Sequence, residues 1–273
     1  MAELLTILAG GGPLPGLLAA AAQAKGWGVQ AVVFPGQPQP NPLPEGVGTK
    51  PFALGQVGHI LAHLKASNTT HVALAGHLHK PSILSLKPDA MGMKLLARAL
   101  VKHDDALLRS VTDFLAEQGF VLVGVADLMP NLLAPLGPLA TARPTAAEQD
   151  DIALGRSTLA ILGDLDIGQA CIVHQGAVLG VEAVEGTDAL IERCAALRSA
   201  EGGTAQGGVL VKRAKLLQTE LADLPFVGPT TMELLGKHGY RGLAIQANKT
   251  LLLEQPTMMA LANRHQLFFE SDA

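Results

Sequence analysis

Cysteine and aromatic residues are the scarcest components of this 273-residue chain. Cys171 and Cys194 are its only cysteines, which is too few for a disulfide framework or a cysteine-ligated zinc site and is typical of a reducing compartment. We expect both to be small, buried, apolar residues. Aromatic residues make up 3% of the chain, so few rings are available to stack on nucleic-acid bases.

Charge is also sparse. Charged residues make up 16% of the chain, the formal net charge is -4, and Lys and Arg form no run. A surface that binds nucleic acid needs clustered positive charge, so we expect no nucleic-acid partner. Any phosphate site must therefore be local.

Signals for membrane insertion and export are missing too. No apolar stretch reaches the roughly 18 to 20 residues of a spanning helix, and no Lys or Arg precedes the first apolar segment, as it does in a signal peptide. We therefore expect a cytoplasmic protein. The mean hydropathy is nevertheless +0.30, which would suit a lipid-handling cleft or peripheral membrane contact.

The order of predicted elements indicates an α/β protein that begins with a parallel sheet. Apolar runs at 3–9 and 29–34 read as buried strands, and residues 13–25 between them read as a helix, which together form a βαβ unit. Further strands at 71–76 and 120–125 alternate with helical segments. This pattern predicts an N-terminal Rossmann-like domain.

Residues 128–148 contain four prolines and no clear periodicity, so they are the best linker candidate. With the boundary placed near Leu136, the predicted domains are 1–135 and 136–273. The second domain reads as mixed α/β, with a helix over 148–163 and two strands that turn at Gln175 and Gly176.

The last part of the chain predicts one helix with clear end signals. Thr230 and Glu233 have capping-box spacing, and Gly239 stands at its end. Segments 242–248 and 250–254 then predict a strand pair.

Three glycines, Gly10 to Gly12, separate the first strand from the first helix. A phosphate-binding P-loop needs Lys followed by Ser or Thr at the helix start, where Pro15 and Gly16 stand instead. A dinucleotide site needs an acidic residue at the end of the second strand, and none is present. Two readings stay open: backbone N–H groups of the turn receive an anionic or polar ligand, or the glycines only make a tight turn.

Adjacent carboxylates begin the segment "DDALLR" (104–109). Asp104 and Asp105 suit a magnesium ion held against a diphosphate. The alternative is a simple N-terminal cap of the helix. Farther along, Glu182, Glu185 and Asp188 surround a strand end and turn, where solvent exposure and helix capping would explain them equally.

A cluster of cations precedes the segment "LPFVGP". Lys212, Arg213 and Lys215 are followed by Gln218 and Asp223. Cations with one carboxylate in an irregular segment suit a phosphate site with a base or metal ligand. A solvated loop would explain them almost as well.

Seven segments together resemble one family over nearly the whole chain. The family is the UDP-2,3-diacylglucosamine pyrophosphatase of lipid A-producing bacteria, in the form not built on the calcineurin-type phosphoesterase fold. The match of each segment alone is weak, but the order and spacing of the segments make the match to this family specific. The segments are "LAGGGPLP", "ALAGHLHKP" (73–81), "PDAMGMKLL" (88–96), "DDALLR", "DIGQACIV" (166–173), "VLGVEAVEGTDALI" (178–191) and the run from Gln218 to "DLPFVG".

The resemblance implies two domains that hold a lipid-linked sugar nucleotide between them. It implies hydrolysis of the diphosphate to 2,3-diacylglucosamine 1-phosphate and UMP, with Mg2+ or another divalent cation such as Mn2+, and attack of water at the sugar-side phosphorus. Peripheral contact with the inner membrane and a homodimer are compatible with it. The essential aspartate of the family falls on Asp223. Metal or water-positioning candidates are Asp104, Asp105 and Glu182, and substrate-binding candidates are Gly10, Gly11, Gly12, Leu14, Pro15, Gly76, Lys80, Gln169, Thr187, Asp188, Lys212 and Gln218.

The chain departs from the family pattern at two places. Leu221 stands where the family motif has an arginine, so either a nearby cation compensates or activity is weaker. His77 and His79 replace other polar residues, but two histidines without a third clustered ligand do not make a metal site. A non-catalytic or redox nucleotide-binding protein that uses the glycine turn, and a weakened homologue that binds the lipid product, remain alternatives.

Overall fold

The computed structural model describes residues 3–79, 86, 88–99, 105–165, 167–200, 206–215 and 224–273. Its described residues up to Pro130 form one compact unit, and those from Asn131 onward form a second. The change of unit falls shortly before Leu136, where the sequence places the domain boundary. No helix in these stretches has the length and apolar character needed to cross a membrane.

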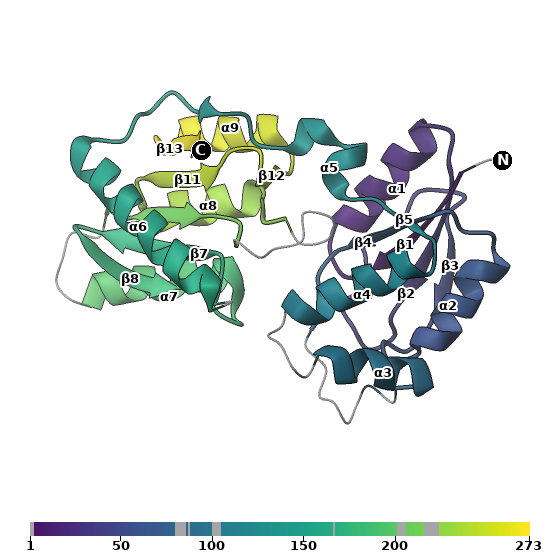
Figure 1. Cartoon of the computed structure of the whole chain (residues 1–273). Coiled ribbons are helices and arrows are strands. Elements are labelled where there is room, and N and C mark those ends of the chain that lie inside the picture. The colour runs from purple at the N-terminus through teal and green to yellow at the C-terminus, as the bar shows by residue number, and fades with distance from the viewer. Residues whose placement is uncertain are drawn as a thin grey trace. The chain divides into compact units, whose positions relative to one another are not determined.

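The first unit contains a five-stranded parallel sheet in the order β3-β2-β1-β4-β5. This is the predicted Rossmann-like arrangement (Figure 1). The strand order reverses between β1 and β4, which is where open α/β sheets bind their ligands. The strands are β1 (Leu4–Ala9), β2 (Gly28–Val33), β3 (Gly48–Pro51), β4 (His71–Ala75) and β5 (Val121–Leu122).

Helices cover both faces of this sheet. Leu8, Val32 and Leu74 stand in one row of the sheet, because β1 pairs with both β2 and β4 in that register, and they face a core built by α2, α3 and α4. Helix α1 buries Leu18 on the opposite face and packs beside α5. The helices are α1 (Leu14–Ala24), α2 (Val57–Ala66), α3 (Ala90–Ala99), α4 (Asp105–Glu117) and α5 (Val125–Leu128); the 3-10 helix η2 (Pro130–Leu132) spans the change of unit.

The second unit contains a six-stranded mixed sheet in the order β6-β13-β11-β9-β7-β8. Strands β9, β11 and β13 are parallel, whereas β6, β7 and β8 add antiparallel pairings, so the predicted mixed α/β class is confirmed. The strands are β6 (Gly137–Pro138), β7 (Ala170–His174), β8 (Ala177–Val181), β9 (Val209–Lys212), β11 (Gly242–Gln246) and β13 (Phe268–Asp272).

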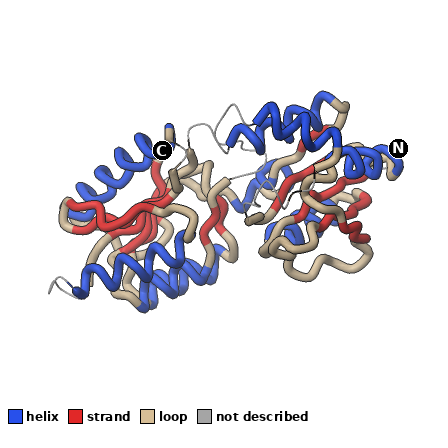
Figure 2. Tube along the Cα trace, turned by 90° about the horizontal axis from the view of Figure 1, so that it is seen from below, coloured by secondary structure: helices blue, strands red, loops and turns tan. Residues whose placement is uncertain are grey.

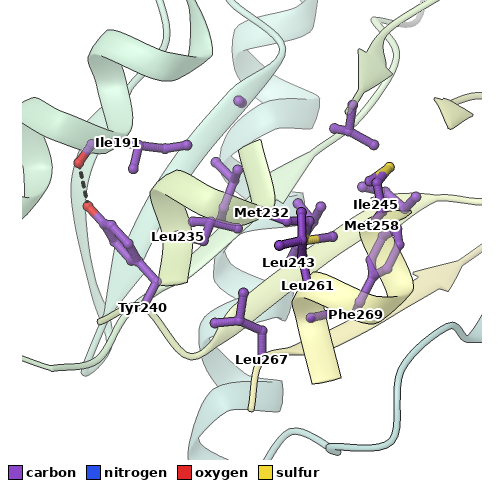
Figure 3. Close-up of a cluster of buried hydrophobic side chains, with 14 of the residues drawn as sticks. Ile191, Met232, Leu235, Tyr240, Leu243, Ile245, Met258, Leu261, Leu267 and Phe269 are labelled. Carbon is purple, nitrogen blue, oxygen red and sulfur yellow. Dashed lines mark hydrogen bonds between the residues drawn. The ribbon is translucent and has the colours of Figure 1, made fainter. Parts of the chain in front are cut away.

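Two apolar cores lie on the two faces of this second sheet. Helix α6 (Ala146–Asp164) covers one face with Ile152 and Leu159, where the buried Cys171 also lies. Helices α7 (Gly186–Ala200), α8 (Pro229–Lys237) and α9 (Gln255–Arg264) cover the other face. Figure 2 shows the strands between these helices, and Figure 3 shows the larger core, in which the Tyr240 hydroxyl donates a 2.7 Å hydrogen bond to the Ile191 carbonyl oxygen.

Three local predictions were wrong. The segment 242–248 does not pair with 250–254; instead β12 (Leu251–Leu252) pairs in parallel with β10 (Phe226–Val227) in a separate two-stranded sheet. Helix α8 is capped by Gly228, not Thr230, because Pro229 occupies the first helical turn. The expected strand 120–125 is too long: β5 covers two of its residues, the Val123 N–H still donates to the Val72 carbonyl oxygen, and α5 begins at Val125.

Candidate functional site

The glycine turn after β1 lies against the turn after β4. The Gly10 N–H donates to the Ala75 carbonyl oxygen (2.8 Å), and Gly11 and His77 exchange N–H to carbonyl bonds of 2.8 and 3.1 Å. Gly76 has φ +90°, and a Cβ at that position would lie 2.6 Å from the Gly11 carbonyl oxygen. Glycine is therefore needed here because two backbones approach closely.

These contacts limit what the turn offers a ligand. The N–H groups of Gly10 and Gly11 are already used by β4 and its turn, and Pro13 and Pro15 at the start of α1 have no N–H to give. The turn still lies at the switch point of the sheet, where a ligand is expected. Binding of substrate by Gly10, Gly11, Gly12, Leu14, Pro15 and Gly76 stays a prediction.

A buried lysine ends the central strand β9 of the second unit. Side chains alternate across a strand, so Lys212 lies on the same face as Leu210, the face that α7 covers. Lys212 is only 8% exposed. Its Nζ lies 5.8 Å from the ring centroid of Phe226. An ammonium group is thus brought to the carboxyl end of a parallel strand and shielded from water.

Lys212 belongs to a chain of three polar side chains. Its Nζ donates to Thr187 Oγ1 (2.9 Å), and the Thr187 hydroxyl donates to Glu182 Oε1 (2.6 Å). Glu182 Oε2 accepts from the Gln169 backbone N–H (3.0 Å). The structure therefore brings together four candidate residues, Gln169, Glu182, Thr187 and Lys212, from three separate segments of the sequence.

Burial and neighbouring charge perturb the ionisable groups here. Burial lowers the pKa of Lys212 below its ordinary value of 10.5, although Glu182 and Asp188 act in the opposite direction. Partial burial raises the pKa of Asp188, an effect that Lys212 opposes and that Glu192 and Glu182 strengthen. Within the described stretches, Lys212 Nζ makes no ion pair and no second hydrogen bond.

The next residue, Arg213, forms an ion pair with Asp272 instead of contacting this chain of polar side chains. Its Nη1 lies 2.8 Å from Asp272 Oδ1, and its backbone N–H donates to the Gln169 carbonyl oxygen (2.9 Å). Arg213 therefore braces the ends of β9 and β13 and the loop before β7. Arg213 is thus paired with a carboxylate, whereas Lys212 Nζ forms no ion pair with any described residue.

Gly168 is a supporting residue that sequence reasoning missed. Its φ is +57°, and a Cβ there would clash with the Glu182 carbonyl oxygen. A glycine just before a predicted strand is the available signal for such a close approach. Gly168 thus lets the Gln169 N–H reach the Glu182 carboxylate.

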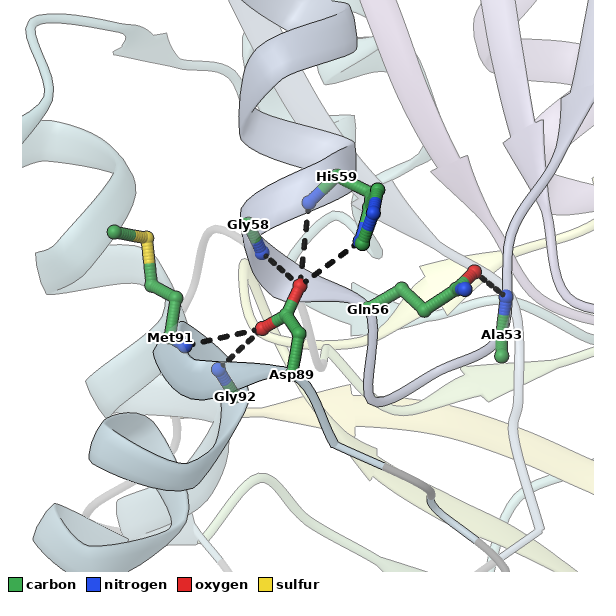
Figure 4. A network of polar contacts seen from close by, with 7 residues as sticks. All are labelled: Ala53, Gln56, Gly58, His59, Asp89, Met91 and Gly92. Atoms are coloured by element: carbon green, nitrogen blue, oxygen red, sulfur yellow. Dashed lines mark hydrogen bonds and ion pairs between the residues drawn. The ribbon is translucent and has the colours of Figure 1, made fainter.

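Asp89 is a second missed residue, and it joins two helix starts in the first unit (Figure 4). Its Oδ2 accepts from the Gly58 N–H (2.7 Å) at the start of α2, and its Oδ1 accepts from the Gly92 N–H (2.8 Å) in α3. Burial pushes the pKa of Asp89 upward, but the N–H groups of Gly92, Gly58 and His59 outweigh it, so the pKa lies below its ordinary value of 3.8. The arrangement is structural, because helix N-termini favour a carboxylate.

Several predicted site residues lie outside the described residues: Lys80, Asp104, Gln218, Asp223 and Leu221. Asp105 is the first residue of α4. In the described parts of the chain, no group of three His, Cys, Asp or Glu side chains could hold a metal ion. The metal assignment of Asp104, Asp105 and Glu182 therefore stays a prediction.

Comparisons with known proteins cover almost the entire chain. The model of the LpxI N-terminal domain matches residues 4–132, and that of the LpxI C-terminal domain matches residues 135–270. The UDP-2,3-diacylglucosamine pyrophosphatase LpxI of Caulobacter vibrioides is 35% identical over 269 residues, which are 97% of this chain and 95% of that protein. A solved structure of CobK precorrin-6A reductase aligns over 98% of both chains, at 13% identity and a TM-score of 0.32. The family matches and the Caulobacter relative together show that this chain belongs to the LpxI family.

Proposed function

We propose that this protein hydrolyses the diphosphate of UDP-2,3-diacylglucosamine to 2,3-diacylglucosamine 1-phosphate and UMP in lipid A biosynthesis. The observation that carries the proposal is the 35% identity, over nearly full length, to a relative named for this activity. The buried Lys212 ammonium supports it, because a diphosphate repels an attacking oxygen until its charge is neutralised.

The residues of this chain take distinct parts in the proposed reaction. Lys212 binds an oxygen of the diphosphate through N–H groups that no described residue uses, and Thr187 fixes the direction of the ammonium. Asp223 orients the attacking water, and the water attacks the sugar-side phosphorus. A shielded cation stabilises the charge that develops on the phosphoryl oxygens more strongly than an exposed one would.

A divalent cation, Mg2+ or Mn2+, is the cofactor that we propose for this reaction. When bound, it would polarise the phosphoryl group and help to neutralise the leaving phosphate. Carboxylate oxygens are ligands of the right kind. The described carboxylates alone do not form such a site, since no group of three His, Cys, Asp or Glu side chains that could hold a metal ion is present among the described residues. No step is therefore assigned to the metal here.

Apolar surface suitable for a lipid is exposed where α6 ends. Ile161 is 68% exposed, Leu165 59% and Ile167 41%, and Val184 in the turn before α7 is 95% exposed. Exposed apolar residues of this kind are typical of contacts with lipid or protein. We include peripheral contact with the inner membrane in the proposal, and a homodimer remains part of it.

The test is release of UMP from UDP-2,3-diacylglucosamine by the purified protein with Mg2+ and, in parallel, Mn2+. A UDP-sugar without acyl chains serves as the control substrate and should be turned over poorly. Asp223→Ala, checked for folding by circular dichroism, should bind substrate without hydrolysing it. Turnover that survives in Asp223→Ala would remove Asp223 from the mechanism, and no UMP from the folded wild type would refute the function.

A further inference from the structure

The hydrogen bonds between Lys212, Thr187 and Glu182 have a fixed direction. A protonated lysine can only donate, so Thr187 Oγ1 must accept at 2.9 Å. The threonine hydroxyl then has one hydrogen left, and Glu182 Oε1 at 2.6 Å accepts it. The geometry thus leaves no alternative donor order in the chain from Lys212 to Glu182.

The other oxygen of Glu182 is tied to the sheet. Oε2 accepts from the Gln169 N–H (3.0 Å), and the Glu182 N–H donates to the Ala170 carbonyl oxygen (2.8 Å). Glu182 is therefore held at the hairpin of β7 and β8, and it holds Thr187 at the start of α7 in turn. Each carboxylate oxygen thus accepts one hydrogen bond from the protein, and in the described part of the chain Glu182 belongs to no group of three His, Cys, Asp or Glu side chains that could hold a metal ion.

We propose that Glu182 is a positioning residue that acts through Thr187 to aim the Lys212 ammonium at a substrate phosphate, instead of a ligand of the divalent cation. The inference rests on the proposed function, because that function supplies the diphosphate. A buried lysine has a long, flexible side chain, and one fixed hydrogen bond restricts it to a single direction. Its two remaining N–H groups are then presented to the anion.

The first experiment measures binding of inorganic pyrophosphate by calorimetry without divalent metal. Thr187→Val keeps the shape of the side chain but removes the hydroxyl, and we expect it to weaken pyrophosphate binding about tenfold. Thr187→Ser keeps the hydroxyl and should restore binding to within about twofold of the wild type. Equal affinity of the wild type and Thr187→Val, or no binding to either, would overturn the inference.

Glu182→Gln separates positioning from simple charge. A single amide oxygen replaces the two carboxylate acceptors, so the links to Gln169 and Thr187 cannot both persist, and binding of pyrophosphate should weaken. A purely electrostatic role predicts the opposite, because loss of a negative charge near an anion site strengthens anion binding. Tighter binding by Glu182→Gln would contradict positioning. The matched control is Glu185→Gln in the same turn, whose carboxylate pairs with Arg193, and it should bind like the wild type.

The metal-ligand alternative gives a different kinetic pattern. It predicts that Glu182→Gln raises the Mg2+ concentration for half-maximal activity at least tenfold while Thr187→Val leaves it unchanged. Positioning predicts that both variants raise KM for the lipid substrate and that neither changes the Mg2+ requirement. The double variant Thr187→Val with Glu182→Gln should bind no less tightly than the single variant that binds least tightly, because both changes break the same chain of hydrogen bonds.

The two proposals fail separately. Pyrophosphate binding needs no turnover, so a wild type that does not hydrolyse UDP-2,3-diacylglucosamine would refute the function and leave the coupling measurable. Normal turnover together with unchanged pyrophosphate affinity in Thr187→Val would refute the positioning role alone. Thermal unfolding of each variant, followed by circular dichroism, excludes global misfolding as the cause.

Discussion

Replacing Lys212 by methionine should lower turnover and raise the free energy of unfolding. Lys212 is only 8% exposed, and its ammonium group lies beside the Phe226 ring and the Thr187 hydroxyl. Methionine retains most of the apolar stem and removes the charge. A buried charge is often replaced by an apolar side chain of similar size at no cost, or with a gain of about 1–4 kcal/mol.

Opposing contributions act in Lys212→Met. Relief of the buried charge stabilises by about 2–3 kcal/mol, whereas the variant loses the hydrogen bond to Thr187, which contributes about 1 kcal/mol. The variant also loses the attraction of Glu182 and Asp188, which burial outweighs in its effect on the pKa of Lys212. We therefore expect a net gain of about 1–2 kcal/mol. Each kcal/mol corresponds to about 2–4 °C in the unfolding temperature of a chain of this size.

The pH dependence of stability gives a sharper test. Because the folded-state pKa of Lys212 lies below 10.5, the unfolded chain binds more protons between the two pKa values. The wild type should therefore gain stability as pH rises through that interval. Below the interval, the destabilisation caused by the buried Lys212 ammonium should be fully present. Lys212→Met should show no such gain from this position.

Chemical denaturation at pH 7 and at pH 9.5 to 10.5 measures both effects, with Lys237→Met on an exposed helix end as the control. Turnover of Lys212→Met should fall at least about 100-fold. A variant that is less stable than the wild type at pH 7, and that retains the wild-type pH dependence, would refute the assignment of a penalty to the buried ammonium.

Three further variants test the supporting structure. Asp89→Asn should lose about 1–2 kcal/mol at pH 7 by weakening the starts of α2 and α3; it should also flatten the loss of stability that the wild type shows as pH falls below 3.8 through the lowered folded-state pKa. Denaturation at pH 7 and pH 3 measures both. Tyr240→Phe should lose about 1–3 kcal/mol in urea unfolding, because the Ile191 carbonyl oxygen loses its buried donor; an unchanged midpoint would contradict that contact. Gly168→Ala should weaken pyrophosphate binding, since its Cβ displaces the Glu182 backbone; calorimetry that finds wild-type affinity would show that this approach is dispensable.

Strand-like apolar runs that alternate with helical segments were enough to predict the Rossmann-like sheet of the first unit. Strand β3 was missed, because Gly48–Pro51 is exposed throughout and has no apolar residue that marks a strand. It joins the sheet through backbone pairing with β2, and such pairing leaves no periodic pattern in the sequence.

The wrong strand pairing has a similar cause. Strands β10 and β12 have two residues each. Their pairing depends on the turn between β11 and β12, in which Asn248 has φ +57°. Runs this short carry no usable period. Only the three-dimensional arrangement distinguishes a hairpin from a pairing with an earlier segment.

The candidate site was predictable residue by residue but not as a network. The pattern of charged residues singled out Glu182 and Lys212, and the family resemblance added Thr187. The contact of Lys212 with the start of α7 follows instead from the sheet register and the crossing of α7 over that face. At the glycine turn, contacts with a distant segment changed what the sequence pattern predicts. Sequence suggested free N–H groups at Gly10 and Gly11, whereas the β4 turn uses them.

The most direct test of the account is the reaction itself. Purified wild-type protein is incubated with UDP-2,3-diacylglucosamine and Mg2+, and the nucleotide and lipid products are separated by chromatography. We expect equimolar UMP and 2,3-diacylglucosamine 1-phosphate, with hydrolysis abolished in Asp223→Ala. Folded wild-type protein that releases no UMP with Mg2+ or Mn2+, or that releases UDP instead, would contradict it.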